Sequence, residues 1–203
     1  MKPEIRKEQA QDYRIVETLT RDAFWDLYKP GCDEHLVLHK MRDVSAFVSE
    51  LDFVATIDDV VVGNIVYSKA KVVDEQGKEH EVLCMGPLGV LPAYQKQGIG
   101  SALIAHSTHI AKEMGYKGVV IFGNPVYYHR FGYKDASAYH ITTSDGQNFD
   151  AFMALELSEG SLEGITGKFY ADPVFESTSE EVEAFEKEFP YREKHITDTQ
   201  LHI

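Results

Sequence analysis

Two glycines separated by a single residue, Gly98 and Gly100, lie where a polar segment gives way to an apolar helical pattern. Glycine costs a helix roughly 1 kcal/mol relative to alanine, so two of them at one helix start predict that something approaches the bare backbone. The first amides of a helix have no partner within it and carry partial positive charge from the helix dipole, so they attract anions. Hydrogen-bond donors precede the glycines at Gln95, Lys96 and Gln97. The pattern favours a phosphate site held mainly by backbone, with close packing of the helix on a sheet as the alternative.

Two common phosphate-binding motifs do not fit this segment. A dinucleotide-binding fingerprint needs its first glycine directly after a strand and a small residue three positions after the second glycine. Here a loop that contains Pro92 separates the preceding strand from Gly98, and Leu103 occupies the third position. A Walker loop fails as well, because no Gly-Lys-Ser/Thr sequence ends the segment. The predicted anion site is therefore of another kind.

The composition limits the class of protein and its partners. A chain of 203 residues suffices for one domain with a full core or at most two small domains. Its 43% of hydrophobic and 26% of charged residues are typical of a soluble globular protein. The net charge of -13 would repel nucleic acid and anionic membranes, so we expect neither as a partner and favour a neutral or cationic small molecule. We expect a monomer or a homodimer.

The cysteines and the apolar runs indicate the compartment. The two cysteines, Cys32 and Cys84, are too few and too dispersed for a disulfide framework and fit a reducing compartment. No apolar run reaches the length of a membrane span, and residues 1–15 lack an apolar secretion segment. We therefore expect a cytoplasmic protein.

Hydrophobic periodicity predicts the elements that would position the glycines. Helices are expected over about 9–24, 34–42 and 98–114, then as one or two turns that end at Gly132, and as a last acidic helix within 177–189 that Ser177 or Ser179 caps. Strands are expected at 4–6, 51–59, 60–74, 80–91, 117–123, 139–142 and 152–157, with a hairpin turn at Asp58-Asp59 and irregular chain after Leu157. This order lacks the regular alternation of a doubly wound fold. It predicts an α/β (α+β) protein with a mixed sheet and helices on both faces.

Two sequence blocks resemble one known superfamily. The segment 88–104, "LGVLPAYQKQGIGSALI", resembles the acetyl-coenzyme A segment of the GNAT acetyltransferases, in which Leu-x-Val, Pro-x-Tyr and Gln/Arg-x-x-Gly-x-Gly/Ala lead from a strand into a helix. The segment 119–133, "VVIFGNPVYYHRFGY", is similar to the next strand and helix of the same superfamily, and to its uncharacterised bacterial branch in particular. The resemblance is strong over 84–133 and compatible with the strand order back to Glu4. It implies a GNAT domain at 1–157 with a mostly antiparallel sheet, and a C-terminal extension at 158–203 that packs on this domain.

The resemblance also implies acetyl-CoA as cosubstrate, no metal, and a set of residues that bind it. The pantetheine arm would lie along Leu88, Gly89 and Val90, with the Val90 amide as donor to the thioester oxygen. Pro87 removes one amide from the strand ladder, which predicts a bulge or splay where a ligand could enter. The pyrophosphate site maps to Gln95, Lys96, Gln97, Gly98, Ile99, Gly100 and Ser101. Asn124 corresponds to a residue that often contacts pantetheine or substrate, although a turn residue before a proline explains it as well.

Catalytic roles follow from the same resemblance. Tyr128 would direct its hydroxyl at the coenzyme A sulfur and protonate the departing thiolate, so that Tyr128 and Val90 are the predicted catalytic residues. Its neighbour Tyr127 has the spacing of a core residue. Cys84 is interpreted as a small buried residue with a raised pKa rather than a nucleophile.

The acceptor side is less determined. The candidates for a base are Glu34, His35 and Glu81, and each is also typical of a solvated surface position. In related proteins the loop after the first helix shapes the acceptor pocket, and this role would fall here to residues 25–35. Trp25 in that loop has the character of a core residue, while Tyr28 beside acidic residues would suit an amine.

Three function classes remain open at this point. The leading interpretation is an N-acetyltransferase that moves the acetyl group of acetyl-CoA to a primary amine of a small acceptor by direct attack. The alternative is a non-catalytic acyl-CoA sensor on the same fold, which would keep the glycine segment and show no turnover. A third class acts on a basic protein tail, and the charge of -13 leaves it open while disfavouring nucleic acid. Release of free thiol with a panel of amines would separate them.

Overall fold

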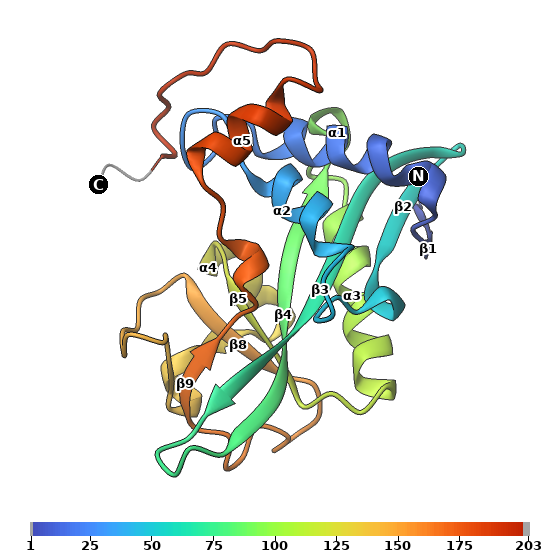
Figure 1. Ribbon diagram of the computed structural model, residues 1–203. Coiled ribbons are helices and arrows are strands. Elements are labelled where there is room, and N and C mark those ends of the chain that lie inside the picture. Colours follow the sequence, from blue (N-terminus) through green and yellow to red (C-terminus); the bar gives the residue numbers. More distant parts are fainter. Residues whose placement is uncertain (1, 201–203) are drawn as a thin grey trace.

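A computed structural model describes residues 2–200, which form one twisted mixed sheet with helices on both faces (Figure 1). The strand order is β1-β2-β3-β4-β5-β8-β6, with β9 on β3 and β7 on β9. The strands are β1 (Glu4–Lys7), β2 (Phe53–Ile57), β3 (Val60–Val73), β4 (Glu79–Val90), β5 (Gly118–Phe122), β6 (Lys134–Asp135), β7 (Ile141–Thr142), β8 (Phe152–Glu156) and β9 (Gly167–Tyr170). Pairing is antiparallel except between β4 and β5 and between β7 and β9. This confirms the predicted fold class.

The helices divide between the two faces of the sheet. They are α1 (Tyr13–Phe24), α2 (Glu34–Met41), α3 (Ile99–Glu113), α4 (Pro125–Tyr128) and α5 (Ser179–Glu186). On β2, Val54 packs in the cluster of α1 and α2, whereas Phe53 and Ala55 pack in the cluster of α3. Since successive side chains of a strand point to opposite faces, α1 and α2 cover one face and α3 the other.

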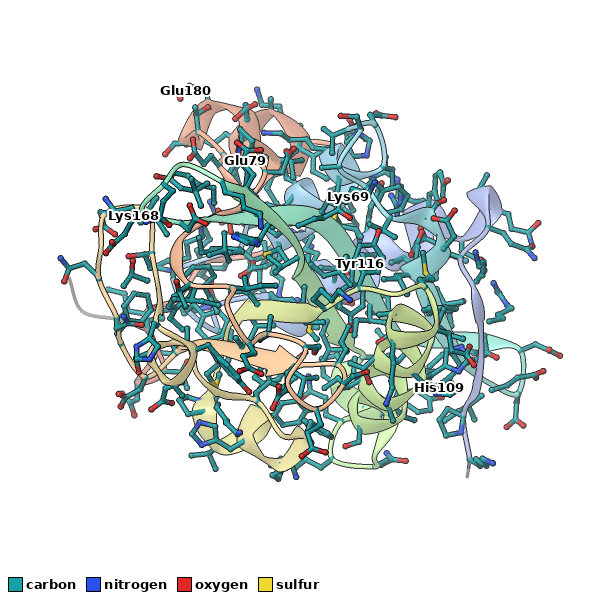
Figure 2. The ribbon with its side chains drawn as sticks, turned by 90° about the horizontal axis from the view of Figure 1, so that it is seen from below. Lys69, Glu79, His109, Tyr116, Lys168 and Glu180 are labelled. Atoms are coloured by element: carbon teal, nitrogen blue, oxygen red, sulfur yellow. The ribbon has the colours of Figure 1, made fainter. Side chains whose placement is uncertain are left out.

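The hairpin between β2 and β3 turns where the sequence predicts it. Asp58 and Asp59 have φ angles of 48° and 65°. Positive φ at both central residues is the requirement of the tight hairpin turn that matches the strand twist, and aspartate tolerates it. In the far part of the long β3–β4 ribbon, the exposed side chains form the cross-strand ion pairs Lys69–Glu81 and Lys71–Glu79. Lys69 and Glu79 are labelled in Figure 2.

The structure corrects the sequence predictions for the C-terminal third of the chain. Thr178, rather than Ser177 or Ser179, caps α5: its hydroxyl accepts from the Glu181 amide at 3.2 Å, and the Glu181 carboxylate accepts from the Thr178 amide at 2.8 Å. This reciprocal pair needs a glutamate three residues after the cap, which excludes Ser179, followed at that distance by Val182. Ser177 has Glu180 at that distance, but its hydroxyl instead donates to the Asp33 carboxylate at 2.9 Å.

Two further predictions for this region need correction. The strand expected at 139–142 is present only as Ile141–Thr142 (β7), because Tyr139 ends a short helical turn and His140 has a φ of 56°. The chain after Leu157, expected to be irregular, contains β9, which pairs with β3 far away in the sequence. The division of the chain at residue 157 itself stays a prediction.

The predicted irregularity at Pro87 is confirmed. Ile65 pairs with Leu88 and Tyr67 with Met85, so one residue of β3 faces two residues of β4, Gly86 and Pro87. This bulge lies where β4 also leaves β5, because these two strands pair only at Leu83↔Val119 and Cys84↔Val120. Beyond Cys84 the sheet is therefore open between two central strands.

Candidate active site

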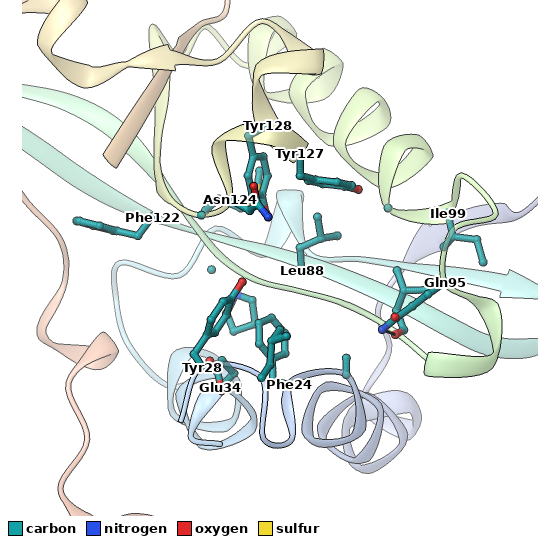
Figure 3. A pocket seen from close by; sticks show the side chains of 18 of the residues that line it. Phe24, Tyr28, Glu34, Leu88, Gln95, Ile99, Phe122, Asn124, Tyr127 and Tyr128 are labelled. Atoms are coloured by element: carbon teal, nitrogen blue, oxygen red, sulfur yellow. Dashed lines mark hydrogen bonds between the residues drawn. The ribbon is translucent and has the colours of Figure 1, made fainter. Parts of the chain in front are cut away.

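A cleft of about 960 Å³ occupies the opening between β4 and β5 (Figure 3). It begins at the start of α3 and passes the end of β4 and α4. It reaches the end of α1, the start of α2 and the segment after β9. Ten of the predicted site residues line it: Leu88, Val90, Gln95, Lys96, Gly98, Ile99, Gly100, Ser101, Asn124 and Tyr128. Gly89 and Gln97 do not.

The backbone of β4 directs hydrogen-bonding groups that β3 does not pair toward this cleft. The Leu91 amide donates to the Val62 carbonyl at 2.9 Å, and antiparallel pairing alternates between bonded and non-bonded positions. Leu88 and Val90 therefore direct their N–H and C=O groups away from β3, into the opening. Gly89 faces the other way and is there for packing, because a Cβ atom on it would lie 2.7 Å from the side-chain oxygen of Asn64.

At the start of α3, Gly98 faces open space and Gly100 is in close contact with a neighbouring side chain. Gly98 caps the helix with a φ of 86°, and a Cβ atom added to it would have no neighbour within 4 Å. At Gly100 a Cβ atom would lie 2.5 Å from the Tyr127 hydroxyl oxygen. The glycine pair thus combines open space at Gly98 with a close approach of the Tyr127 side chain, rather than of the sheet, at Gly100. The anion site stays a prediction. The Ile99 side chain is buried in the core, so it can offer a ligand only its backbone.

The polar residues before the helix are held by the loop itself. The side chain of Gln95 donates to the Val90 carbonyl at 3.1 Å, which ties the loop to the end of β4. The side chain of Gln97 donates to the Ala93 carbonyl at 3.2 Å and lies outside the cleft. Lys96 has a φ of 61°, a conformation that costs a non-glycine residue energy. Gln95 and Gln97 thus support the loop, while the exposed Lys96 is left as its cation beside the cleft.

Asn124 and α4 place Tyr128 above the end of β4. The Asn124 side-chain oxygen accepts from the Val126 amide at 2.9 Å and caps α4, with Pro125 at its first position. The expectation that Asn124 serves the turn is therefore confirmed, and the same residue also lines the cleft.

Tyr128 presents a protonated hydroxyl inside the cleft. Its hydroxyl donates only to a weak acceptor, the sulfur of Met85, at 3.9 Å. Burial raises the pKa of Tyr128 well above its usual range, with a smaller contribution from Tyr127. A phenol in this environment keeps its proton at neutral pH and has it free to give. Tyr127 is half-buried and lines the cleft with its hydroxyl over Gly100, so its interpretation as a core residue was incomplete.

The three candidate bases have very different environments. Glu34 is not a solvated surface residue: it lines the cleft at the start of α2, and desolvation raises its pKa to about 7. His35 is fully buried, with Nε2 at 2.7 Å from a Glu186 carboxylate oxygen, and burial lowers its pKa to about 4. Glu81 is exposed on the far part of β4, as expected. Of the three, Glu34 alone reaches the cleft.

Two other sequence interpretations are confirmed. Cys84 is buried without a disulfide, and burial raises its pKa to about 12. Trp25 is 8% exposed and donates its ring N–H to the Glu193 carbonyl at 3.0 Å. Neither residue has the environment of a nucleophile or of a ligand platform.

Sequence reasoning missed part of the cleft wall. Phe122 ends β5 and follows directly from the strand pattern, so its place beside the opening could have been found. Phe175 comes from the segment after β9 and reaches the cleft only through the pairing of β9 with β3. No local signal in the sequence indicates that contact.

Comparison with known proteins places this chain in a family. The family described as "Acetyltransferase (GNAT) domain" matches residues 49–135. The Escherichia coli (strain K12) protein named "Uncharacterized N-acetyltransferase YhbS" is 32% identical over 164 residues, which are 80% of this chain and 92% of that protein. YjhQ, also named as an N-acetyltransferase in E. coli K12, is 29% identical over 128 residues, 63% of this chain and 66% of that protein.

Two crystal structures are similar along most of the chain. That of YhbS from E. coli in complex with CoA has a TM-score of 0.76 and 28% identity, and covers 86% of this chain and 92% of its own. That of a GNAT family acetyltransferase from Brucella melitensis in complex with acetyl-CoA has a TM-score of 0.69 and 27% identity, and covers 86% and 99%. By sequence and by fold the protein is an acyltransferase that transfers groups other than aminoacyl groups. It belongs to the GNAT family of N-acetyltransferases.

Residues 2–200 lack two kinds of feature. None of their helices combines the length and the apolar character needed to cross a membrane. No three His, Cys, Asp or Glu side chains among them are arranged to hold a metal ion.

Proposed function

We propose that this enzyme binds acetyl-CoA in the cleft between β4 and β5 and transfers the acetyl group to a primary amine of a small acceptor by direct attack. The observation that carries the proposal is the meeting of three features in one cleft: the unpaired edge of β4 at Leu88 and Val90, the bare start of α3 at Gly98, and the hydroxyl of Tyr128. The bound CoA and acetyl-CoA of the two similar structures support it.

The residues present fit the cosubstrate on physical grounds. The open space at Gly98 and the first amides of α3 suit a pyrophosphate, with Lys96 beside them as a cation. The N–H groups of Leu88 and Val90 and the C=O group of Leu88, which do not pair with β3, suit the amide groups of a pantetheine arm, which would pair with β4 like an added strand. In this proposal Gly89 and Gln97 support the strand and the loop without contacting the ligand.

Acetyl-CoA supplies an acetyl group activated as a thioester. The Val90 amide donates a hydrogen bond to the carbonyl oxygen of that thioester, where negative charge develops when an amine attacks. The Tyr128 hydroxyl keeps a proton for the sulfur that departs. The net charge of -13 supports a cationic or neutral acceptor over nucleic acid.

The test is Tyr128→Phe, with Tyr127→Phe as the matched control on the adjacent residue. If Tyr128 donates a proton in the transition state, kcat falls on the order of 10²-fold with little change in acetyl-CoA affinity. Tyr127→Phe should change kcat much less. Thiol release measures kcat and calorimetry measures the affinity. A loss of affinity or stability with intact kcat would remove the catalytic role from Tyr128, and tight cofactor binding with no turnover on any amine would favour an acyl-CoA sensor.

A further inference from the structure

The end of the cleft beyond Tyr128 has its own composition, and we name it the acceptor end: Phe24, Tyr28, Glu34, Phe122 and Phe175. We propose that this end takes an aromatic or otherwise apolar primary amine that carries no carboxylate, and that Glu34 binds its ammonium group and accepts its proton. The inference rests on the proposed acetyl transfer and deepens it, since it names the acceptor class and the base.

Glu34 is held where an amine would need it. It begins α2, and its carboxylate accepts a hydrogen bond from the Asp33 amide at 3.1 Å, which fixes the side chain over the cleft. Figure 3 shows Glu34 beside Tyr28 and Phe24 on one side of Leu88 and Tyr128 on the other side, with the hydroxyls of Tyr28 and Tyr128 turned toward one another. An ammonium group at Glu34 would therefore stand near the end of β4.

The charges of the cleft are segregated. Among the described residues that line it, the cationic side chains are Lys96, on the loop before Gly98, and Arg130, which lies over the Tyr127 ring at 4.7 Å. The acceptor end holds Glu34, and next to it Asp33, which accepts from the Ser177 hydroxyl at 2.9 Å and forms an ion pair with the half-exposed Lys29. Lys29 does not line the cleft, so a carboxylate on the acceptor would meet the like charge of Glu34 without a cation among the described residues of the cleft wall at this end.

The rest of the acceptor end is apolar surface available to a ligand. Tyr28 and Phe122 are 47% and 53% exposed, although both line the cleft. Phe122 is stacked on Phe152 with ring centroids 5.0 Å apart, so its free face is presented by a fixed ring. Asp33 is already paired with Lys29 and Ser177, so Glu34 is the carboxylate left for a ligand within these aromatic walls. Such a site suits a cation with an apolar body better than a polyamine, whose further charges would stay unpaired.

Glu34 also supplies the base that must remove a proton from the ammonium group before the amine can attack. Desolvation raises its pKa to about 7, the range in which a carboxylate can take a proton from an amine and return it to water. Glu34 accepts one proton from the ammonium and passes it to solvent, and the freed nitrogen lone pair forms the C–N bond as the C–S bond breaks. Tyr128 gives its proton to the sulfur and regains one from the nitrogen. The sum releases one proton, as conversion of an ammonium ion and a thioester to an amide and a thiol requires.

The test compares acceptors in matched pairs on the wild-type enzyme: 2-phenylethylamine with L-phenylalanine, and tyramine with L-tyrosine, with spermidine as the polyamine. We expect kcat/KM for each amine to exceed that for its amino acid by at least about 100-fold. The carboxylate of the amino acid would lie near the Glu34 carboxylate without a cation in the cleft wall to pair with it. Equal rates for the members of each pair, or a preference for spermidine, would overturn the inference.

Glu34→Gln tests the residue, with Glu81→Gln as the control that removes an exposed carboxylate far from the cleft. We expect Glu34→Gln to lower kcat/KM for 2-phenylethylamine about 100-fold, to reduce its advantage over L-phenylalanine, and to leave the thermal shift by acetyl-CoA unchanged. Full activity of Glu34→Gln would refute the role of Glu34. If Glu34→Gln fails to fold, the wild-type comparison of amines with amino acids still decides the acceptor class. If the wild type acetylates other primary amines but neither 2-phenylethylamine nor tyramine, the inference fails and the proposed acetyl transfer stands. Binding of acetyl-CoA with no turnover on any amine would overturn both.

Discussion

The contact between Gly98 and the cosubstrate can be isolated by substitution with alanine. Gly98 and Gly115 lie at opposite ends of α3 and have nearly the same backbone conformation, with φ angles of 86° and 87°. At both positions an added Cβ atom would meet nothing within 4 Å. Alanine at either position therefore imposes the same strain, while only Gly98→Ala puts a methyl group into the cleft.

The magnitudes separate the two effects. Left-handed backbone costs an alanine about 1–2 kcal/mol, which for a domain of this size lowers Tm by about 2–8 °C in both variants. A ligand at 100 times its Kd stabilises the wild type by about 2.7 kcal/mol, or about 5–11 °C. If the methyl group removes one charge-assisted hydrogen bond worth about 2 kcal/mol, Kd rises about 30-fold. The same ligand concentration then stabilises Gly98→Ala by about 0.9 kcal/mol, a third of the wild-type value.

The assay is thermal denaturation of the three proteins without and with a fixed concentration of acetyl-CoA, supported by calorimetric Kd values. We expect equal Tm values for the two variants without ligand, a full shift for Gly115→Ala and about a third of it for Gly98→Ala. Equal shifts in both variants would show that the start of α3 does not bind the cosubstrate. An equal loss in both would mean that strain travels along the helix, and the local argument would be wrong.

Two further predictions concern the C-terminal helix and the proposed base. Glu186→Ala leaves Arg21 and His35 buried without their carboxylate and should lower the unfolding free energy by about 3–5 kcal/mol in urea denaturation, whereas Glu188→Ala, at an exposed ion pair, should cost less than about 1 kcal/mol. Similar small losses for both would contradict the anchoring role of Glu186. Because a base must be deprotonated to act and desolvation raises the pKa of Glu34 to about 7, kcat/KM for the amine should rise with pH through about 7, and Glu34→Gln should abolish this rise. The same rise in the variant would assign it to another group.

The parts of the structure that the sequence predicts are those determined by short stretches of chain. The turn at Asp58-Asp59, the bulge at Pro87 and the helix that starts after Gly98 each follow from residues within a few positions. Contacts between distant segments do not. The ion pair between His35 and Glu186 joins residues 151 positions apart (186 - 35), and nothing near His35 in the sequence distinguishes it from a surface histidine.

Glu34 shows the same limit in the site itself. Its carboxylate would be solvated on an isolated helix, and it lines the cleft because α2 is packed between the sheet and the C-terminal segment. Leu36, two residues after Glu34, packs on Phe185 and Phe189 of that segment. A residue whose environment is made by a distant part of the chain cannot be assigned a function from its own neighbours in the sequence.

The two halves of the cleft differ in what they are made of, and this bears on how the family diverges. The half proposed for acetyl-CoA uses backbone groups of β4 and α3, which do not depend on the identity of the side chains as long as the chain adopts the same fold. This half lies within the matched residues 49–135. The acceptor end uses side chains, and Phe24, Tyr28, Glu34 and Phe175 lie outside that range. Substitutions there leave the backbone groups proposed to bind acetyl-CoA in place, since they fall on other elements of the chain. We therefore expect acceptor specificity to follow residues 23–37 and 171–175 rather than the motif by which the family is identified, and an exchange of these segments with YhbS should change the preferred amine while acetyl-CoA affinity stays within about threefold.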